Sequence, residues 1–175
     1  MKLKNLAAPM IALAVLAPST FVPDANALSC MRPDVIRALE DAKASEKLYH
    51  VVLGQFISLN PYPVKPPVTD NANASRPPKI TRAYFEGRAL TRNPHRDQRL
   101  TRFPVDIETR CAGPWCSSPP NNDSKQVAFI EARPGDVPIL RIGPCPQWTF
   151  SAEPKRVQLV RDCLDKTCEP EAMDY

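Results

Sequence analysis

The hydrophobic positions of this chain change period several times, and each period predicts a different element. After Pro33, which suits the first turn of a helix, apolar residues recur at helical spacing, so we expect a helix over residues 33–45. Between Leu48 and Leu59 the period is two and both faces are largely apolar, which is typical of a strand covered on two sides. A cluster of prolines within residues 60–79 then predicts a long irregular loop.

The middle of the chain carries the clearest strand signal. Ile80 to Leu90 has the composition of a strand in which Gly87 marks a bulge, and residues 91–100 are polar and irregular. From Phe103 to Cys111, apolar and polar residues alternate, which indicates a strand with one buried face. The following segment, residues 111–124, is rich in Ser, Pro and Asn and predicts another loop.

The last third of the chain predicts a hairpin and a helix. Val127–Ile130 and Val137–Ile142 are short apolar runs joined by turn residues at 133–136, so we expect them to pair as a hairpin. Ser151 can cap a final helix. Its apolar positions are Val157, Val160 and Leu164. Five strands with a helix at each end, and none between strands, favour a mainly β fold, a five-stranded OB-like β-barrel, over a parallel α/β sheet.

The N-terminal residues have the three parts of a secretory signal. Lys2 and Lys4 precede an apolar run from Leu6 to Leu16, which is too short to span a bilayer. The small residues of Ala25-Asn26-Ala27 then supply a cleavage site, after which the mature chain begins at Leu28. We therefore expect residues 1–27 to be a cleavable signal peptide.

Removal of the signal peptide defines which residues we expect to form the folded domain and where in the cell we expect the protein. Residues 28–168 form one OB-like barrel domain in this interpretation, and residues 169–175 form a loose acidic tail. A second cleavage frame, after Ser29, would make Cys30 the first residue. In both frames we expect a protein of the periplasm or one secreted from the cell.

Charge and cysteine content narrow the function classes. Without residues 1–27 the chain has 21 basic and 18 acidic residues, a net charge of about +3 that is too small to indicate a polyanionic partner by itself. No later apolar run is long enough to span a membrane. An even number of cysteines in an exported domain predicts three disulfides with 15 allowed pairings. These cysteines are Cys30, Cys111, Cys116, Cys145, Cys163 and Cys168. The two C-x4-C pairs lack the tighter spacing common in zinc sites, so we expect no metal and no cofactor.

The cysteines and the elements beside them follow a definite order along the chain. Cys30-Met31-Arg32-Pro33 opens the mature chain, and a helical stretch and the strand at Tyr49–Gly54 follow. Cys111 ends a mid-chain strand, Cys145 follows the last strand and Cys163 closes the final helix. In this order the chain resembles the netrin/TIMP-like group of OB-fold domains, and Tyr49–Gly54 is similar to that family's first strand. One departure is that the inhibitor branch opens with C-x-C, which this chain lacks. A bacterial exported family that shares only the barrel is the alternative.

The resemblance implies both a disulfide pairing and a mechanism. It pairs Cys30 with Cys111, Cys116 with Cys145, and Cys163 with Cys168. If the signal is cut after Ser29, the α-amine and carbonyl of Cys30 can coordinate the open position of a metalloprotease's catalytic zinc. Cleavage after Ala27 would leave two residues ahead of Cys30 and block this chelation.

Arginines are concentrated between residues 76 and 102, where only Glu86 and Asp97 are acidic. The candidate anion-binding residues are Arg82, Arg88, Arg92, Arg96, Arg99 and Arg102. On an OB-fold, a basic groove with interleaved aromatic residues can bind oligosaccharide or single-stranded nucleic acid. Outside the cytosol we expect an anionic glycan or envelope surface and no nucleic acid. The alternative is a solvated face, because these arginines fall on both sides of their strand.

Signals for catalysis are poor. His50 lies in an apolar strand and His95 in an arginine-rich loop, and the chain shows no nucleophile elbow, zinc-binding helix or phosphate loop. Asp106 and Glu108 share one strand face, as an acid and base pair would, but such a pair is more often the wet face of a half-buried strand. We therefore expect no enzyme.

The remaining expectations concern binding. Trp115 and Trp148 each lie near a proline and a cysteine, which is typical of rings packed on disulfides in a core, whereas an exposed tryptophan would mark a ligand surface. The chain is thus predicted to be a non-enzymatic binding module. Its partner is an unknown protein, with protease inhibition the most concrete form, or alternatively an anionic glycan bound through residues 76–102.

Overall fold

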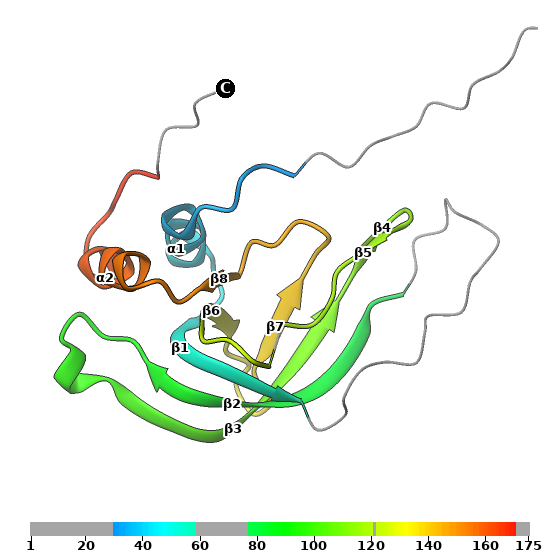
Figure 1. The fold of residues 1–175 in the computed structure, drawn as a ribbon, viewed down its shortest axis with the longest axis horizontal. Helices are drawn as coiled ribbons and strands as arrows, with labels where there is room; N and C mark the ends of the chain where they lie inside the picture. Colours follow the sequence, from blue (N-terminus) through cyan, green and yellow to red (C-terminus); the bar gives the residue numbers. More distant parts are fainter. Residues whose placement is uncertain (1–29, 59–76, 121, 171–175) are drawn as a thin grey trace, which may run out of the picture.

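Strand β1 (Tyr49–Ser58) pairs along both of its edges, and this closes the sheet into a barrel. In the computed structural model, which describes residues 30–58, 77–120 and 122–170, β1 is antiparallel to β2 (Lys79–Ala89) and to β6 (Gln126–Glu131). The remaining barrel strands are β3 (Gln98–Thr109) and β7 (Ile139–Ile142), in the order β1-β2-β3-β7-β6. The closed five-stranded, mainly β barrel predicted from the sequence is confirmed (Figure 1).

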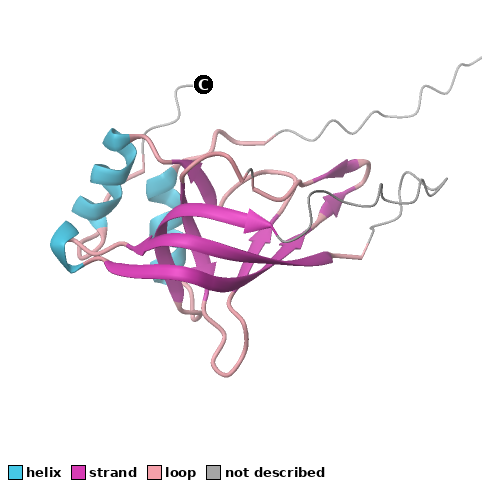
Figure 2. Ribbon diagram, turned by 60° about the horizontal axis from the view of Figure 1, so that its bottom comes forward, coloured by secondary structure: helices cyan, strands magenta, loops and turns pink. Residues whose placement is uncertain are grey.

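The short elements lie around this barrel. Strand β8 (Thr149–Ser151) pairs with the beginning of β6 on the edge that β7 leaves open. Strands β4 (Cys111–Ala112) and β5 (Trp115–Cys116) pair only with each other, as a small separate hairpin. Helices α1 (Val35–Ala44) and α2 (Pro154–Cys163) lie together on one side, and the 3-10 turn η1 (Pro94–Arg96) connects β2 to β3 (Figure 2).

Two apolar clusters explain why β1 is apolar on both faces. Val52 and Phe56 point into the barrel, where they pack with buried residues of β2, β3, β6 and β7. Tyr49, Val51 and Leu53 point outward, where they join a second cluster under the two helices. The strand is thus covered on two sides, as its composition predicts, because the helices bury its outer face.

Both helices begin at a different residue from the one predicted, after a different N-cap residue. Helix α1 begins at Val35, because the Asp34 carboxylate accepts the backbone N–H groups of Ile36 at 2.7 Å and Arg37 at 3.1 Å and so acts as the N-cap. Pro33 therefore precedes the cap instead of opening the helix. At the other end, Ser151 belongs to β8, and α2 opens on Pro154 with Glu153 as N-cap.

Strand pairing also differs from the prediction. The expected β6–β7 hairpin is reduced to one pair, Glu131 with Ile139, while β7 runs parallel to β3 over Asp106–Thr109. Strand β3 starts at Gln98, inside the segment predicted to be irregular. The predicted bulge is present, but its extra residue lies on β3: two steps from Phe85 to Gly87 face three steps from Leu100 to Phe103.

Gly87 has a different role, which it shares with Gly54. The two glycines face each other in the β1–β2 register, and a Cβ on Gly54 would lie 2.7 Å from the Cα of Gly87 and overlap the carbonyl oxygen of Glu86. A Cβ on Gly87 would likewise overlap the carbonyl oxygen of Leu53. Because these two glycines have no side chains, β1 and β2 can approach each other closely where the sheet bends.

The described cysteines form three disulfides, but with a different pairing from the one that the resemblance implies. Cys30 bonds to Cys145, not Cys111, and Cys111 bonds to Cys116. Only the predicted Cys163–Cys168 bond is confirmed. The reason is local: Cys111 and Cys116 face each other across the β4–β5 pair with Cα atoms 4.0 Å apart, so they close on each other.

The two tryptophans have opposite environments. Trp148 stacks on Tyr49 with ring centroids 5.1 Å apart and meets Phe129 edge-on, as expected for a core residue. Trp115 lies on the β4–β5 hairpin and keeps 44% of its surface exposed, so the expected core packing is wrong for this residue. Figure 2 shows this hairpin at the end of the molecule away from the helices.

Candidate functional site

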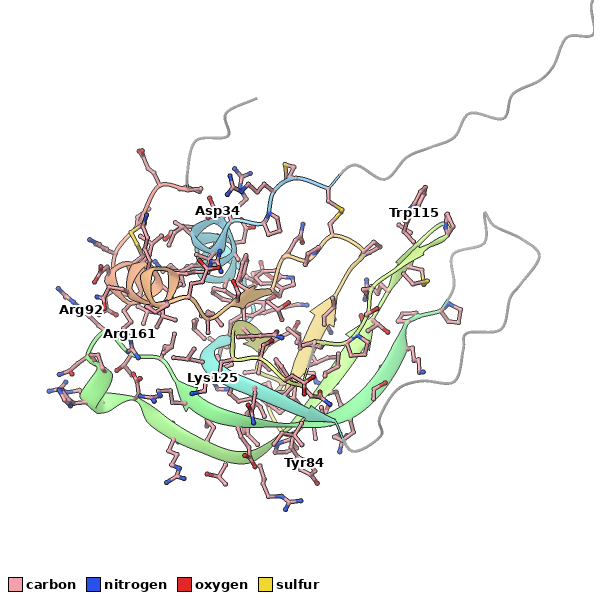
Figure 3. All side chains as sticks on the ribbon, in the orientation of Figure 1. Asp34, Tyr84, Arg92, Trp115, Lys125 and Arg161 are labelled. Atoms are coloured by element: carbon pink, nitrogen blue, oxygen red, sulfur yellow. A yellow bond between two sulfur atoms is a disulfide. The ribbon has the colours of Figure 1, made fainter. Side chains whose placement is uncertain are left out.

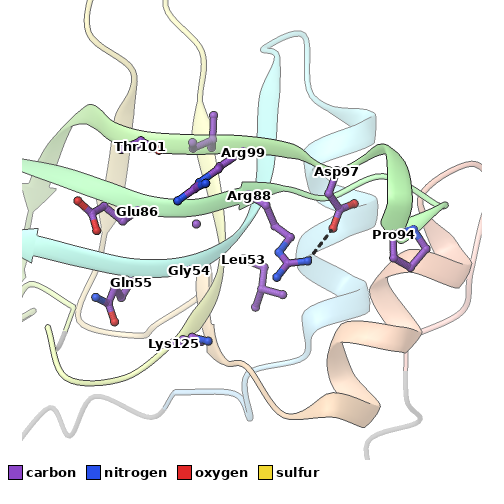
Figure 4. A pocket seen from close by; sticks show the side chains of 12 residues that line it. Leu53, Gly54, Gln55, Glu86, Arg88, Pro94, Asp97, Arg99, Thr101 and Lys125 are labelled. Atoms are coloured by element: carbon purple, nitrogen blue, oxygen red, sulfur yellow. Dashed lines mark ion pairs between the residues drawn. The ribbon is translucent and has the colours of Figure 1, made fainter.

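A groove of about 530 Å³ crosses the outer surface of β1, β2 and β3 (Figure 4). Its sides are formed by η1 and by Lys125, which directly precedes β6. The residues that give it chemical character are Gln55, Glu86, Arg88, Asp97, Arg99 and Lys125. The groove lies where the Gly54–Gly87 approach and the β3 bulge bend the sheet, because a bulge kinks its strand and increases the local twist.

Two arginines occupy neighbouring strand positions in this groove. Arg88 on β2 is directly opposite Arg99 on β3 in the antiparallel register. Like charges at such positions destabilise a sheet by up to about 1 kcal/mol. Figure 4 shows Arg99 directed from β3 toward β2. The fold therefore places two arginines at adjacent backbone positions in the lining of one groove, with Arg88 directed toward Asp97.

Asp97, the acid that pairs with Arg88, is engaged more closely by another cation. Arg161 of α2 donates two hydrogen bonds to its carboxylate, at 2.8 and 2.5 Å, and the Thr91 backbone N–H donates a third at 2.9 Å. Arg88 reaches the same carboxylate only at 3.9 Å. Hydrogen bonding to Arg161 lowers the pKa of Asp97 against the opposing effect of burial, so this carboxyl stays ionised and paired.

The other charged groups of the groove have no partners within the described part of the chain. Arg99, Lys125 and Glu86 take part in none of its ion pairs. Arg99 and Lys125 are exposed, while Glu86 is half-buried. Within the described residues, Arg99 and Lys125 therefore have no ion-pair partner, and Arg88 has only the distant Asp97. The one unpaired carboxylate that these residues contribute to the groove is that of Glu86.

The two carboxylates on β3 are predicted to face solvent, and this prediction is wrong. Asp106 and Glu108 are 9% and 7% exposed, although they point out of the barrel. Arg82 and Arg133 bind Asp106 at 2.5 and 2.8 Å, and Arg110 binds Glu108 at 2.5 Å. Guanidinium groups thus cover these acids and hold their oxygens in ion pairs.

The same row of ion pairs continues across β7 to β6. Arg141 lies between Glu108, at 3.6 Å, and Glu131, which it contacts closely, and Lys47 binds Glu131 at 3.1 Å. Three buried acids on the barrel's outer face are therefore satisfied by five cations. The β3 alternation signals only that these positions face outward. Their burial comes from arginines beyond the strand: Arg82 on β2, Arg141 on β7, Arg133 between β6 and β7, and Arg110 just after β3.

The six predicted anion-binding arginines do not share one surface. Arg88 and Arg99 meet in the groove, while Arg82 is held by Asp106. Arg102 lies 5.3 Å above the Tyr84 ring, on the β3 bulge. The other two are exposed in the β2–β3 connection, Arg92 before η1 and Arg96 within it. Figure 3 shows Arg92 beside α2 and well apart from Tyr84.

Sequence reasoning missed Lys125 entirely. Its place in the groove results from the β1–β6 pairing, which sets Gly54 opposite Gln126. No local pattern around Lys125 signals that contact, because the two strands are far apart in the chain. Lys125 is the third cation of the groove and lies outside the arginine-rich segment.

Cys30, the predicted zinc-chelating residue, is exposed and its sulfur is held in the bond to Cys145. The two proposed cleavage points and the expected signal peptide, residues 1–27, lie outside the described residues. No helix within the described ranges is long and apolar enough to cross a membrane. No cluster of three or more His, Cys, Asp or Glu side chains with metal-binding geometry is found in those ranges either.

Comparison with known proteins adds no relative. No protein-family model matches the chain, and neither a curated protein sequence nor a solved structure matches it. The fold and the groove are therefore the basis for any functional conclusion.

Proposed function

We propose that this protein is an exported, non-enzymatic binding module that takes an anionic ligand, part of a glycan or of the cell envelope, in the groove over β1, β2 and β3. The observation that carries the proposal is the cross-strand pair of Arg88 and Arg99 with Lys125 beside it. Asp97, the acid that pairs with Arg88 among the described residues, is committed to Arg161.

The energetics of the groove favour an anion. A carboxylate, phosphate or sulfate between Arg88 and Arg99 replaces their mutual repulsion by charge-assisted hydrogen bonds. Guanidinium groups are suited to this because their planar fork binds such oxyanions through two parallel N–H donors. The volume of about 530 Å³ lies in the range of small-ligand sites, so the groove can hold a short segment of a longer polymer.

The compartment in which the protein works restricts the classes of ligand that it meets. Three disulfides among the described residues are typical of a protein that works in an oxidising compartment. Anionic polysaccharides and envelope headgroups are the abundant polyanions there, and the groove has no exposed row of aromatic rings on which nucleic-acid bases would stack. This supports the glycan or envelope alternative over nucleic acid.

Two matched double variants test the groove. R99Q/K125Q removes one arginine and one lysine from it, while R92Q/K155Q removes the same charges from exposed positions outside it. Binding of the exported protein to polygalacturonate and to heparin is measured by titration calorimetry at several salt concentrations. We expect R99Q/K125Q to weaken binding at least about tenfold and R92Q/K155Q about twofold or less, with affinity falling as salt rises. Equal losses in both variants, or no binding by the unmodified protein, would contradict the proposal.

Protease inhibition through Cys30 is a second candidate function. It is favoured by one observation: Cys30 is exposed while its sulfur is fixed by Cys145, as a chelating N-terminal cysteine requires. The intact mass of the exported protein tests it. A chain that starts at Cys30 supports the mechanism and is then assayed against metalloproteases, whereas a start at Leu28 removes it, because two residues would precede the chelating amine.

A further inference from the structure

Glu86 is the one carboxylate of the groove that no cation neutralises within the described residues, and it lies among three cations. We infer that it selects the ligand: an acidic oligosaccharide of the uronic-acid type, with one carboxylate and free hydroxyls on each sugar. Densely sulfated and polyphosphate chains are then disfavoured. This inference rests on the groove proposed above.

The position of Glu86 is set by strand register. It lies opposite Gln55 of β1 and two residues before Arg88 on the same face of β2. The groove is therefore divided along β2: a cationic row formed by Arg88 and Arg99, and a polar row formed by Gln55 and Glu86. Figure 4 shows the two rows side by side.

The β3 bulge explains why Glu86 has no cation in a segment so rich in arginine. The register shift falls between Phe85 and Gly87, so Glu86 faces the extra β3 residue instead of a regular partner. Arg102 belongs to this bulge, with φ 49°, and its guanidinium lies over the Tyr84 ring at 5.3 Å. The bulge residue Arg102 is thus directed to the Tyr84 ring and not to Glu86, and re-aiming a side chain is a common effect of bulges.

The chemistry of the polar row fits sugar hydroxyls. An ionised carboxylate only accepts hydrogen bonds, so Glu86 needs a donor from its ligand, and a hydroxyl is such a donor. Gln55 can both donate and accept, and Thr101 adds a hydroxyl at the same level of the groove. A sugar acid therefore satisfies both rows at once, with its carboxylate on the arginines and its hydroxyls on Glu86 and Gln55.

The same carboxylate acts against denser polyanions. Polyphosphate has no hydroxyl along its chain and places charge on every unit, so a segment long enough to fill the groove brings negative charge against Glu86. Specificity arises as much from such repulsion as from favourable contacts. Glu86 thus lowers the affinity for the most highly charged polymers, which simple electrostatics would otherwise favour.

The test compares Glu86→Gln with Glu46→Gln, an exposed acid outside the groove that has no ion pair in the described chain. Binding of each variant to polygalacturonate, heparin and polyphosphate is measured by titration calorimetry at one fixed ionic strength. We expect E86Q to weaken polygalacturonate binding about fivefold and to strengthen heparin and polyphosphate binding by a similar factor, because it replaces one accepting carboxylate oxygen by an NH2 donor and removes a repulsive charge. E46Q should change all three alike and only slightly.

The outcomes separate this inference from the groove itself. If E86Q raises all three affinities alike, as E46Q does, Glu86 acts only through net charge and the inference fails, although the groove stands. Tighter binding of polyphosphate or heparin than of polygalacturonate by the unmodified protein, with loss in R99Q/K125Q, also overturns the inference alone. If none of the three polymers binds, both proposals fall.

Discussion

Replacing Arg161 by methionine removes the cation that ties α2 to the connection between β2 and β3. Arg161 and Asp97 are side chains exposed by only 6% and 3%, and two direct hydrogen bonds join them. Thr91 adds its backbone N–H and hydroxyl to Asp97, and its carbonyl accepts from Arg161. In R161M the Asp97 carboxylate keeps only Thr91 and a distant Arg88 at 3.9 Å.

The expected loss is large because the remaining charge stays buried. Removing one partner of a buried ion pair destabilises a protein by about 3–5 kcal/mol. The matched control is Arg156→Met on the same helix, whose pair with Glu153 leaves the acid 64% exposed. Exposed pairs contribute about 0–1 kcal/mol, so R156M should cost no more than that. Urea unfolding at pH 7, followed by circular dichroism, measures both variants.

The pH dependence gives the reasoning a second check. Hydrogen bonding to Arg161 lowers the pKa of Asp97 in the folded protein below its unfolded value. Its contribution to stability is therefore complete above the unfolded pKa, near 3.8, and is lost as the pH falls through the folded pKa. The stability difference between the unmodified protein and D97N should accordingly shrink toward acid pH.

Two results would refute this account. The first is a loss below about 1 kcal/mol in R161M, which would mean that Asp97 is not a buried, dependent charge. The second is a D97N difference that stays constant down to pH 3. The double variant D97N/R161M should lose less than the sum of the single losses, because it leaves neither charge alone.

Three further predictions concern the rest of the fold. Gly54→Ala should destabilise the protein by about 1–3 kcal/mol in urea unfolding, because the new Cβ overlaps the backbone of β2 beside Gly87, and an unchanged midpoint would show that the strands separate freely. Trp115→Ala should change stability by less than about 0.5 kcal/mol, since the ring is exposed on a separate hairpin, and a larger loss would place it in a packed contact. Serine at both Cys30 and Cys145, which are 115 residues apart in the sequence, should cost about 5 kcal/mol in the chain-entropy model, and peptide mapping without reduction should recover these two cysteines linked.

The sequence determined the elements because their signals are local. The two-sided apolar pattern of β1 and the periodic apolar positions of the helices depend only on which faces of each element are buried. The count of five barrel strands followed from these patterns, and so did the OB-like architecture. The Cys163–Cys168 bond came only from the family resemblance, which mispaired Cys111 and Cys116 although they have the same spacing.

Only the tertiary structure decided how distant segments meet. The parallel β3–β7 pairing, the Cys30–Cys145 bond and the place of Lys125 beside Gly54 each join residues far apart in the chain. Their geometry results from closure of the whole barrel, which no local period encodes. For the same reason, the arginine-rich segment predicts a basic surface but not which of its arginines line the groove. Neighbours supplied by other strands decide which arginines pair with buried acids and which remain in the groove.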